Sequence, residues 1–201
     1  MAELPSRIIL ASGNPNKARE FEAIMAGIHV EPLPAGLTLP PETGDTFEEN
    51  ARLKAQAVHE QLAARSPGEA PWVMADDSGI EVQALGGAPG IYSARYAGEG
   101  ATDADNNGKL LAELAGADDR SARFVCVLVA VAPDGGELVS EGIFEGSIAH
   151  EPGAAGGFGY DPLFIPADYS LKVSELPAEE KNRISHRARA ALGMLDKLRG
   201  G

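Results

Sequence analysis

A short apolar run meets two adjacent acidic residues near the middle of the chain. Residues 72–75 (Trp-Val-Met-Ala) have the composition of a buried strand, and Asp76 and Asp77 follow them directly, before Ser78 and Gly79. Carboxylates at the end of a buried strand are costly to desolvate unless a cation neutralises them, and hard oxygen ligands suit Mg²⁺. Because Asp, Ser and Gly are also common turn formers, the stretch predicts either a plain turn or an acidic metal-binding site.

The remaining pattern alternates apolar runs with helical periodicity, which favours an α/β fold built on a mixed central sheet flanked by helices. We expect strands at residues 7–11, 29–33, 72–75, 123–132 and 137–146 and helices at 16–25, 46–64, 103–114 and 185–198. Residues 133–136 (Pro-Asp-Gly-Gly) predict a hairpin. Its first arm is almost wholly apolar, so we place it centrally, and its second arm alternates more, which places it nearer an edge.

The net charge of −13 argues against a sequence-independent nucleic-acid binder, because such proteins need a basic surface. A small polyanionic substrate would have to meet locally concentrated lysines and arginines, or a metal ion. No apolar run is long enough for a membrane span or a secretory signal. The one cysteine, Cys126, lies in an apolar run and is expected to be buried, and the lack of a disulfide framework favours the cytoplasm.

Two further segments carry candidate phosphate ligands. Residues 12–17 form a small loop between a strand and a helix, where free backbone N–H groups and the helix dipole attract anions, and Lys17 adds a charge; a plain helix cap is an equal alternative. Thr46 and Glu49 form a capping box. On the helix that follows, Lys54 lies among small apolar residues, where it is either a surface lysine or a ligand.

The C-terminal third contains a Gly-rich patch and a charged block. Residues 153–161 include Gly156, Gly157 and Gly159, which permit positive φ and leave Phe158 able to stack on a nucleobase, unless it is ordinary core. In residues 179–187, the side chains of Lys181 and His186 are five positions apart and would lie ~140° apart around a continuous helix. If both side chains are to reach one ligand the helix must break, and Ser185 is a good cap for a new helix. We therefore predict a short turn or helix at residues 179–184 and a long helix from His186.

Five segments in this order resemble the inosine/xanthosine triphosphate pyrophosphatases of the Ham1 family. They are residues 12–17, 46–55, 73–98, 157–162 and 179–187, and the resemblance spans residues 12 to about 192. It implies one enzyme domain over residues 1–201, with two lobes and the substrate cleft between them, and a homodimer.

The resemblance also implies roles for individual residues. Asp77 is the implied general base, and Glu42 and Asp77 the implied Mg²⁺ ligands; Asp76 is an alternative for either role of Asp77, and Glu49 is an alternative for Glu42. The implied substrate ligands are Ser12, Gly13, Asn14, Lys17, Lys54, Ser78, Phe158, Gly159, Tyr160, Asp161, Lys181, His186 and Arg187.

The implied activity is hydrolysis of non-standard purine nucleoside triphosphates (ITP, dITP, XTP) to the monophosphate and pyrophosphate. Arg187 and His186 would donate to a 6-keto oxygen, and a donor–donor clash would reject adenine. Two alternatives stay open at this point. One is a Maf-like pyrophosphatase acting on modified pyrimidines or methylated guanine, and the other is a nucleotide-binding module without turnover.

Overall fold

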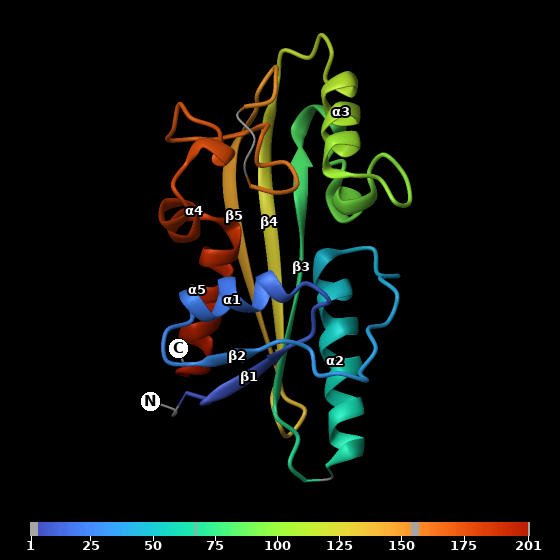
Figure 1. Ribbon diagram of the computed structural model, residues 1–201, viewed down its shortest axis with the longest axis vertical. Coiled ribbons are helices and arrows are strands. Elements are labelled where there is room, and N and C mark those ends of the chain that lie inside the picture. Colours follow the sequence, from blue (N-terminus) through green and yellow to red (C-terminus); the bar gives the residue numbers. More distant parts are fainter. Residues whose placement is uncertain (1–3, 67, 154–156, 201) are drawn as a thin grey trace. The chain divides into compact units, whose positions relative to one another are not determined.

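The computed structural model describes residues 4–66, 68–153 and 157–200, and in these ranges six strands form a sheet in the order β2-β1-β3-β4-β5-β6 (Figure 1). The strands are β1 (Arg7–Leu10), β2 (His29–Glu31), β3 (Trp72–Val82), β4 (Ser121–Val131), β5 (Glu137–Ile148) and β6 (Phe164–Pro166). The helices are α1 (Pro15–Ile24), α2 (Phe47–Arg65), α3 (Asp103–Glu113), α4 (Ala178–Ile184) and α5 (His186–Leu198), with 3₁₀ turns η1 (Gln83–Leu85), η2 (Gly90–Arg95) and η3 (Val173–Glu175). The part of the chain described contains no helix long and apolar enough to cross a membrane.

The sheet is mixed, which confirms the α/β prediction. β1 pairs in parallel with both β2 and β3, whereas β5 pairs antiparallel with β6. β4 and β5 are joined by the predicted hairpin, closed by hydrogen bonds between Ala132 and both Gly135 and Gly136. The almost wholly apolar β4 lies between β3 and β5. The three-residue β6 was not predicted, because it is too short to show a periodicity.

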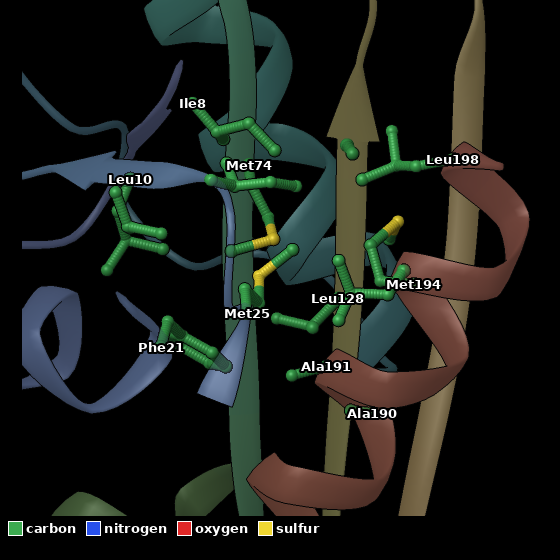
Figure 2. Close-up of a cluster of buried hydrophobic side chains, with 14 of the residues drawn as sticks. Ile8, Leu10, Phe21, Met25, Met74, Leu128, Ala190, Ala191, Met194 and Leu198 are labelled. Carbon is green, nitrogen blue, oxygen red and sulfur yellow. The ribbon is translucent and has the colours of Figure 1, made fainter. Parts of the chain in front are cut away.

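Two compact units can be distinguished. Unit 1 consists of Met1–Asp77, Cys126–Gly142 and Arg187–Gly201, and unit 2 of Ser78–Val125 and Ile143–His186. In unit 1 the sheet is buried on both faces. One face packs against α1 and α5 through a cluster that includes Leu10, Phe21, Met74, Leu128 and Met194, and Figure 2 shows these side chains meeting. Cys126 belongs to this cluster and is fully buried, and burial raises the pKa of its thiol, which supports a structural role.

The opposite face of the unit 1 sheet packs against α2. Alternate residues of the strands, such as Ile9, Val73 and Val129, meet Ala51, Ala55 and Val58 of the helix. The helix begins as predicted, because the Thr46 hydroxyl accepts from the Glu49 amide at 3.1 Å. The Glu49 carboxylate accepts from the amide of Asp45 at 2.7 Å, one residue before the expected partner.

Unit 2 has its own apolar core. Strand residues Ile80, Val82, Phe124 and Phe144 pack with Leu110 and Leu114 of α3 and with Tyr160, Leu163 and Phe164. The predicted α3 begins with a capping box in which Thr102 and Asp105 satisfy each other's backbone amides. This core fixes the segment that follows the Gly-rich patch. Gly156 of that patch lies outside the described residues.

β3 differs from the prediction. The strand does not end at residue 75 but continues to Val82, so Asp76, Asp77, Ser78 and Gly79 are strand residues and not a turn. The turn-forming composition is overridden because the long neighbouring strand β4 offers a continuous hydrogen-bonding edge. The break at Ser185 is confirmed: this residue has an extended backbone (φ −64°, ψ 160°) between α4 and α5.

Candidate functional site

The continuation of β3 places the two adjacent aspartates on opposite faces of the sheet, since successive side chains of a strand alternate. Asp76 shares its face with Met74, which packs in the cluster with α1 and α5. Asp77 shares its face with Val73 and Ala75, which pack against α2. The two carboxylates therefore have different nearest cations, Lys17 for Asp76 and Lys54 for Asp77.

Asp76 is held as a charged, paired group. Its side chain is 1% exposed, and its Oδ2 lies 2.7 Å from Nζ of Lys17 in α1. Burial acts to raise the pKa of Asp76, but the charges of Lys17 and Arg187 prevail and hold that pKa below its ordinary value. Arg187 also faces Glu20, with 3.7 Å between NH1 and Oε2. This face of unit 1 thus combines Lys17 and Arg187 with the buried carboxylate of Asp76 and the half-buried one of Glu20.

Asp77 lies in a different electrostatic environment, with Lys54 and Glu42. Nζ of Lys54 lies 2.7 Å from Oε1 of Glu42 and 3.5 Å from Oδ1 of Asp77. Burial raises the pKa of Asp77 above its ordinary value despite the opposing charge of Lys54, and Glu42 raises it further. Burial acts to lower the pKa of Lys54, but the acidic neighbours, Asp77 first, raise it overall. The helical lysine is therefore a buried cation between two acids and not a surface residue.

Asn50 is a member of this site that the sequence did not single out. It is 1% exposed, and its Oδ1 accepts from the amide of Gly44 at 2.8 Å, two residues after Glu42. Its amide Nδ2 and Oδ2 of Asp77 are both buried with no partner within hydrogen-bonding distance among the described residues, but Asn50 is close enough to act against burial and lower the pKa of Asp77. Asn50 thus fixes the loop that carries Glu42 and lies on the same side of the strand as Asp77.

These residues fit a hard divalent cation. Glu42 and Asp77 supply carboxylate oxygens around one position that now holds an ammonium group, and the unpaired, buried Oδ2 of Asp77 has capacity for a further ligand. Among the residues described, no three His, Cys, Asp or Glu side chains form a metal cluster. A bound Mg²⁺ would therefore complete its shell with water and substrate oxygens, as this ion commonly does. Glu49 is already occupied as a cap.

The loop between β1 and α1 leads directly to Lys17. Ser12 Oγ accepts from the amide of Asn14 at 3.2 Å, and the Asn14 carbonyl accepts from the amide of Lys17 at 3.2 Å. Gly13 has no atom within 4 Å of the position a Cβ would take, so the loop is open there. Ser78 follows Asp77 in β3 and is half-buried. The loop presents its polar groups on the surface of unit 1.

In unit 2, Phe158, Asp161 and Lys181 form a second cluster. The Phe158 ring is 47% exposed although it is a large apolar group. Nζ of Lys181 lies 4.1 Å from the centre of this ring and 2.6 Å from Oδ2 of Asp161, which also accepts from the Phe158 amide at 3.0 Å. A cation on an aromatic face is a favourable contact. Phe158 is therefore an oriented surface aromatic and not ordinary core.

Tyr160 and His186 are buried components of unit 2. Tyr160 is 4% exposed, and its hydroxyl donates to the Ser93 carbonyl at 2.8 Å, so it anchors the Gly-rich segment to η2. The His186 ring stacks on Phe124, with 4.8 Å between centroids and 11° between planes. The imidazole plane is thus fixed by core packing, which is a suitable basis for a directional hydrogen bond.

Gly157 should tolerate no side chain. Its φ is +70°, and an added Cβ would lie 2.4 Å from Oδ2 of Asp161, whereas Gly159 (φ +59°) has nothing within 4 Å of that position. Both alanine variants carry the left-handed strain of about 1–2 kcal/mol, but only Gly157→Ala adds a clash of about 1–3 kcal/mol. We expect urea unfolding to show the larger loss of stability for Gly157→Ala. Equal losses in the two variants would contradict the contact with Asp161.

Comparisons with known proteins show the family of this chain. A sequence profile of the Ham1 family matches residues 8–197. The dITP/XTP pyrophosphatase of Desulfotalea psychrophila is 48% identical over 91% of this chain and 81% of its own, and that of Clostridium perfringens is 45% identical over 96% and 98%.

Solved structures give the same result. The Ham1 protein of Staphylococcus aureus has a TM-score of 0.85 and 42% identity, covering 96% of this chain and 98% of its own. The HAM1 protein of Coxiella burnetii has a TM-score of 0.86 and 38% identity, covering 97% and 99%. The chain belongs to the Ham1 family.

Proposed function

We propose that this chain hydrolyses non-standard purine nucleoside triphosphates (dITP, ITP and XTP) to the monophosphate and pyrophosphate, which keeps aberrant purines out of nucleic acids. The observation that carries the proposal is the grouping of Asp77, Glu42 and Lys54 in a buried acidic site. A module that only bound nucleotides would not need two carboxylates held against one cation. Relatives that are 45–48% identical are named dITP/XTP pyrophosphatases, which supports the same reaction.

In the proposed reaction, a water oxygen attacks the α-phosphorus. A bond forms between that oxygen and the α-phosphorus, the bond from the α-phosphorus to the bridging oxygen breaks, and pyrophosphate leaves with the electron pair. The water proton passes to a carboxylate. We assign this base role to Asp77 before Asp76, because Asp76 is already paired with Lys17 and its pKa is lowered, whereas the pKa of Asp77 is raised.

The phosphates would meet the positive groups of unit 1. Lys17 and Lys54 would bind them, and Ser12, Gly13, Asn14 and Ser78 would donate hydrogen bonds from the loop and strand. Mg²⁺ held by Glu42 and Asp77 would supply further charge stabilisation for the leaving group. Each lysine already faces an acid, so binding of a polyanion would exchange one anionic partner for another.

The purine would meet unit 2, where Phe158 presents its ring for stacking, a contact worth about 1–3 kcal/mol in single-strand binders. Asp161 and Lys181 hold Phe158 in place, and Gly159 and Tyr160 would complete the base site. His186 and Arg187 would donate to the 6-keto oxygen, and adenine presents an amino donor there instead. An unpaired donor–donor contact is the reason we expect ATP to be rejected.

We further propose that both units act as one enzyme domain, that the enzyme is a homodimer, and that it works in the cytoplasm. The last proposal rests on the single buried thiol, Cys126.

The test is pyrophosphate release from ITP, dITP, XTP, GTP and ATP, each with Mg²⁺ and with EDTA. We expect release from ITP, dITP and XTP and almost none from ATP, and only with the metal. Equal hydrolysis of ATP would contradict the assigned base selectivity. Preference for modified pyrimidines would favour a Maf-like enzyme instead, and binding without release would favour a nucleotide-binding module.

A further inference from the structure

Helix α3 holds both polar backbone groups of Gly159, the residue between Phe158 and Tyr160. The Gly159 amide donates to Oδ2 of Asp103 at 2.6 Å, and Nδ2 of Asn107 donates to the Gly159 carbonyl at 3.0 Å. Asp103 and Asn107 are four residues apart and therefore lie on one face of the helix. Among the described residues, no atom beyond the two chain neighbours lies within 4 Å of the position that a Cβ on Gly159 would take.

We propose that Asp103 and Asn107 are positioning residues of the purine site, which fix Gly159 and thereby set the plane of the Phe158 ring. The inference rests on the proposed function. The Asp161 carboxylate accepts a hydrogen bond from the Phe158 amide. It also pairs with Lys181, whose ammonium group lies over one face of the Phe158 ring. Helix α3 fixes the backbone of the next residue, Gly159, through Asp103 and Asn107. With one side held by α4 and the other by α3, the exposed ring keeps one orientation for stacking.

The two contacts also define how the base is recognised. Because the Gly159 amide and carbonyl already bond to α3, the purine meets the aromatic ring of Phe158 and not the backbone of Gly159. Loss of the α3 contacts should weaken binding of nucleotides that carry a base, and leave binding of pyrophosphate alone unchanged.

The side chain of Asn107 is hydrogen-bonded at its nitrogen and not at its oxygen among the described residues. It is 8% exposed, and its Oδ1 is buried without a hydrogen bond among the described residues. A buried, unsatisfied acceptor is costly, and its removal in Asn107→Leu offsets the loss of the hydrogen bond to the Gly159 carbonyl, so we expect little change in the free energy of unfolding. If Asn107 served only to stabilise α3, that free energy would fall.

The neighbouring Asn106 provides a matched control. It is 3% exposed and also bonds a loop backbone, accepting from the Ala97 amide at 2.8 Å and donating to the Ala94 carbonyl at 3.2 Å. It lies on the same helix and differs in the segment it holds. Asp103 has a conservative control of its own, because Asp103→Asn keeps an acceptor and Asp103→Ala does not.

The experiment compares Asn107→Leu with Asn106→Ala, and Asp103→Ala with Asp103→Asn. We expect Asn107→Leu and Asp103→Ala to raise KM for ITP by about five- to tenfold, with the inhibition constant of pyrophosphate unchanged, and Asp103→Asn to retain a KM near that of the unaltered chain. An unchanged KM in both variants, or an equal rise in Asn106→Ala, would overturn the inference.

A second readout does not depend on catalysis. Amide hydrogen exchange of Gly159, followed by NMR, should accelerate in Asp103→Ala and stay slow in Asp103→Asn. If the unaltered chain hydrolyses no nucleotide, the proposed function fails, while this exchange still tests the contact with α3. Equal protection in the two variants would show that Asp103 does not hold Gly159.

Discussion

Asp77→Asn should lower kcat for ITP by about 10³-fold or more and leave the free energy of unfolding in EDTA unchanged or slightly raised. Activity is lost because the variant removes both a metal ligand and the proposed base. Stability is retained because burial raises the pKa of Asp77, which means that its charge costs stability in the folded state at neutral pH. A neutral isostere removes that cost.

Asp76→Asn is the matched control, since the same change is made one residue away on the other face of the sheet. Its pKa is lowered in the folded state, so its charge stabilises the fold above the unfolded pKa and this contribution is lost as pH falls through the folded pKa. We expect the free energy of unfolding of Asp76→Asn to fall by about 1–2 kcal/mol at pH 7. This is less than for a fully buried pair, because Lys17 can reach solvent. The difference from the unaltered chain should shrink in acid. Stability changes of the same sign in the two variants would contradict the assignment of opposite environments.

Lys54→Met should have the second-largest effect, because it leaves Glu42 and Asp77 facing each other without their shared cation. The side chain of Lys54 is 9% exposed, and removing one partner of a buried pair costs about 3–5 kcal/mol. Because Glu42 is about one-third exposed, we expect a smaller decrease for Lys54→Met, of about 2–3 kcal/mol in the free energy of unfolding measured in urea with EDTA. Added Mg²⁺ should restore more stability to this variant than to the unaltered chain. The kcat/KM for ITP should fall by about 10²-fold.

Arg52→Met provides the control for that variant. Arg52 lies two residues earlier on α2 and also bonds two carboxylates, Glu48 at 2.7 Å and Glu137 at 3.0 Å, but at the surface. Surface ion pairs contribute about 0–1 kcal/mol, so its loss should be small and insensitive to Mg²⁺. Similar losses for Lys54→Met and Arg52→Met would show that the acidic site is not a buried one.

Much of the fold could be predicted from local pattern. The β4–β5 hairpin followed from composition, because it is set by residues close in sequence. The break at Ser185 followed from helix geometry and capping together with the family resemblance, which implies that Lys181 and His186 contact one ligand. The course of β3 could not be predicted. Its turn-forming residues become strand only because β4, which is distant in sequence, lies alongside. A strand that ended at residue 75 gave no reason to expect Asp76 and Asp77 on opposite faces of the sheet.

In the candidate site, too, some features could be predicted from the sequence, whereas others depend on contacts between distant parts of the chain. The motif residues were identified by resemblance, but which groups meet depends on contacts between distant parts of the chain, such as Lys54 with Asp77 and Lys17 with Asp76. Asn50 has no signal of its own, because it lies within a helix next to better-known capping residues. The contacts of α3 with Gly159 join residues 52 and 56 positions apart, and no periodicity reports such a contact.

The most direct test of the account is the position of bond cleavage in ITP, measured by hydrolysis in ¹⁸O-labelled water and mass analysis of the products. Attack at the α-phosphorus predicts label in the nucleoside monophosphate and none in the pyrophosphate. Label in orthophosphate, with a nucleoside diphosphate as the other product, would contradict the account, because the acidic site would then act on the terminal phosphate.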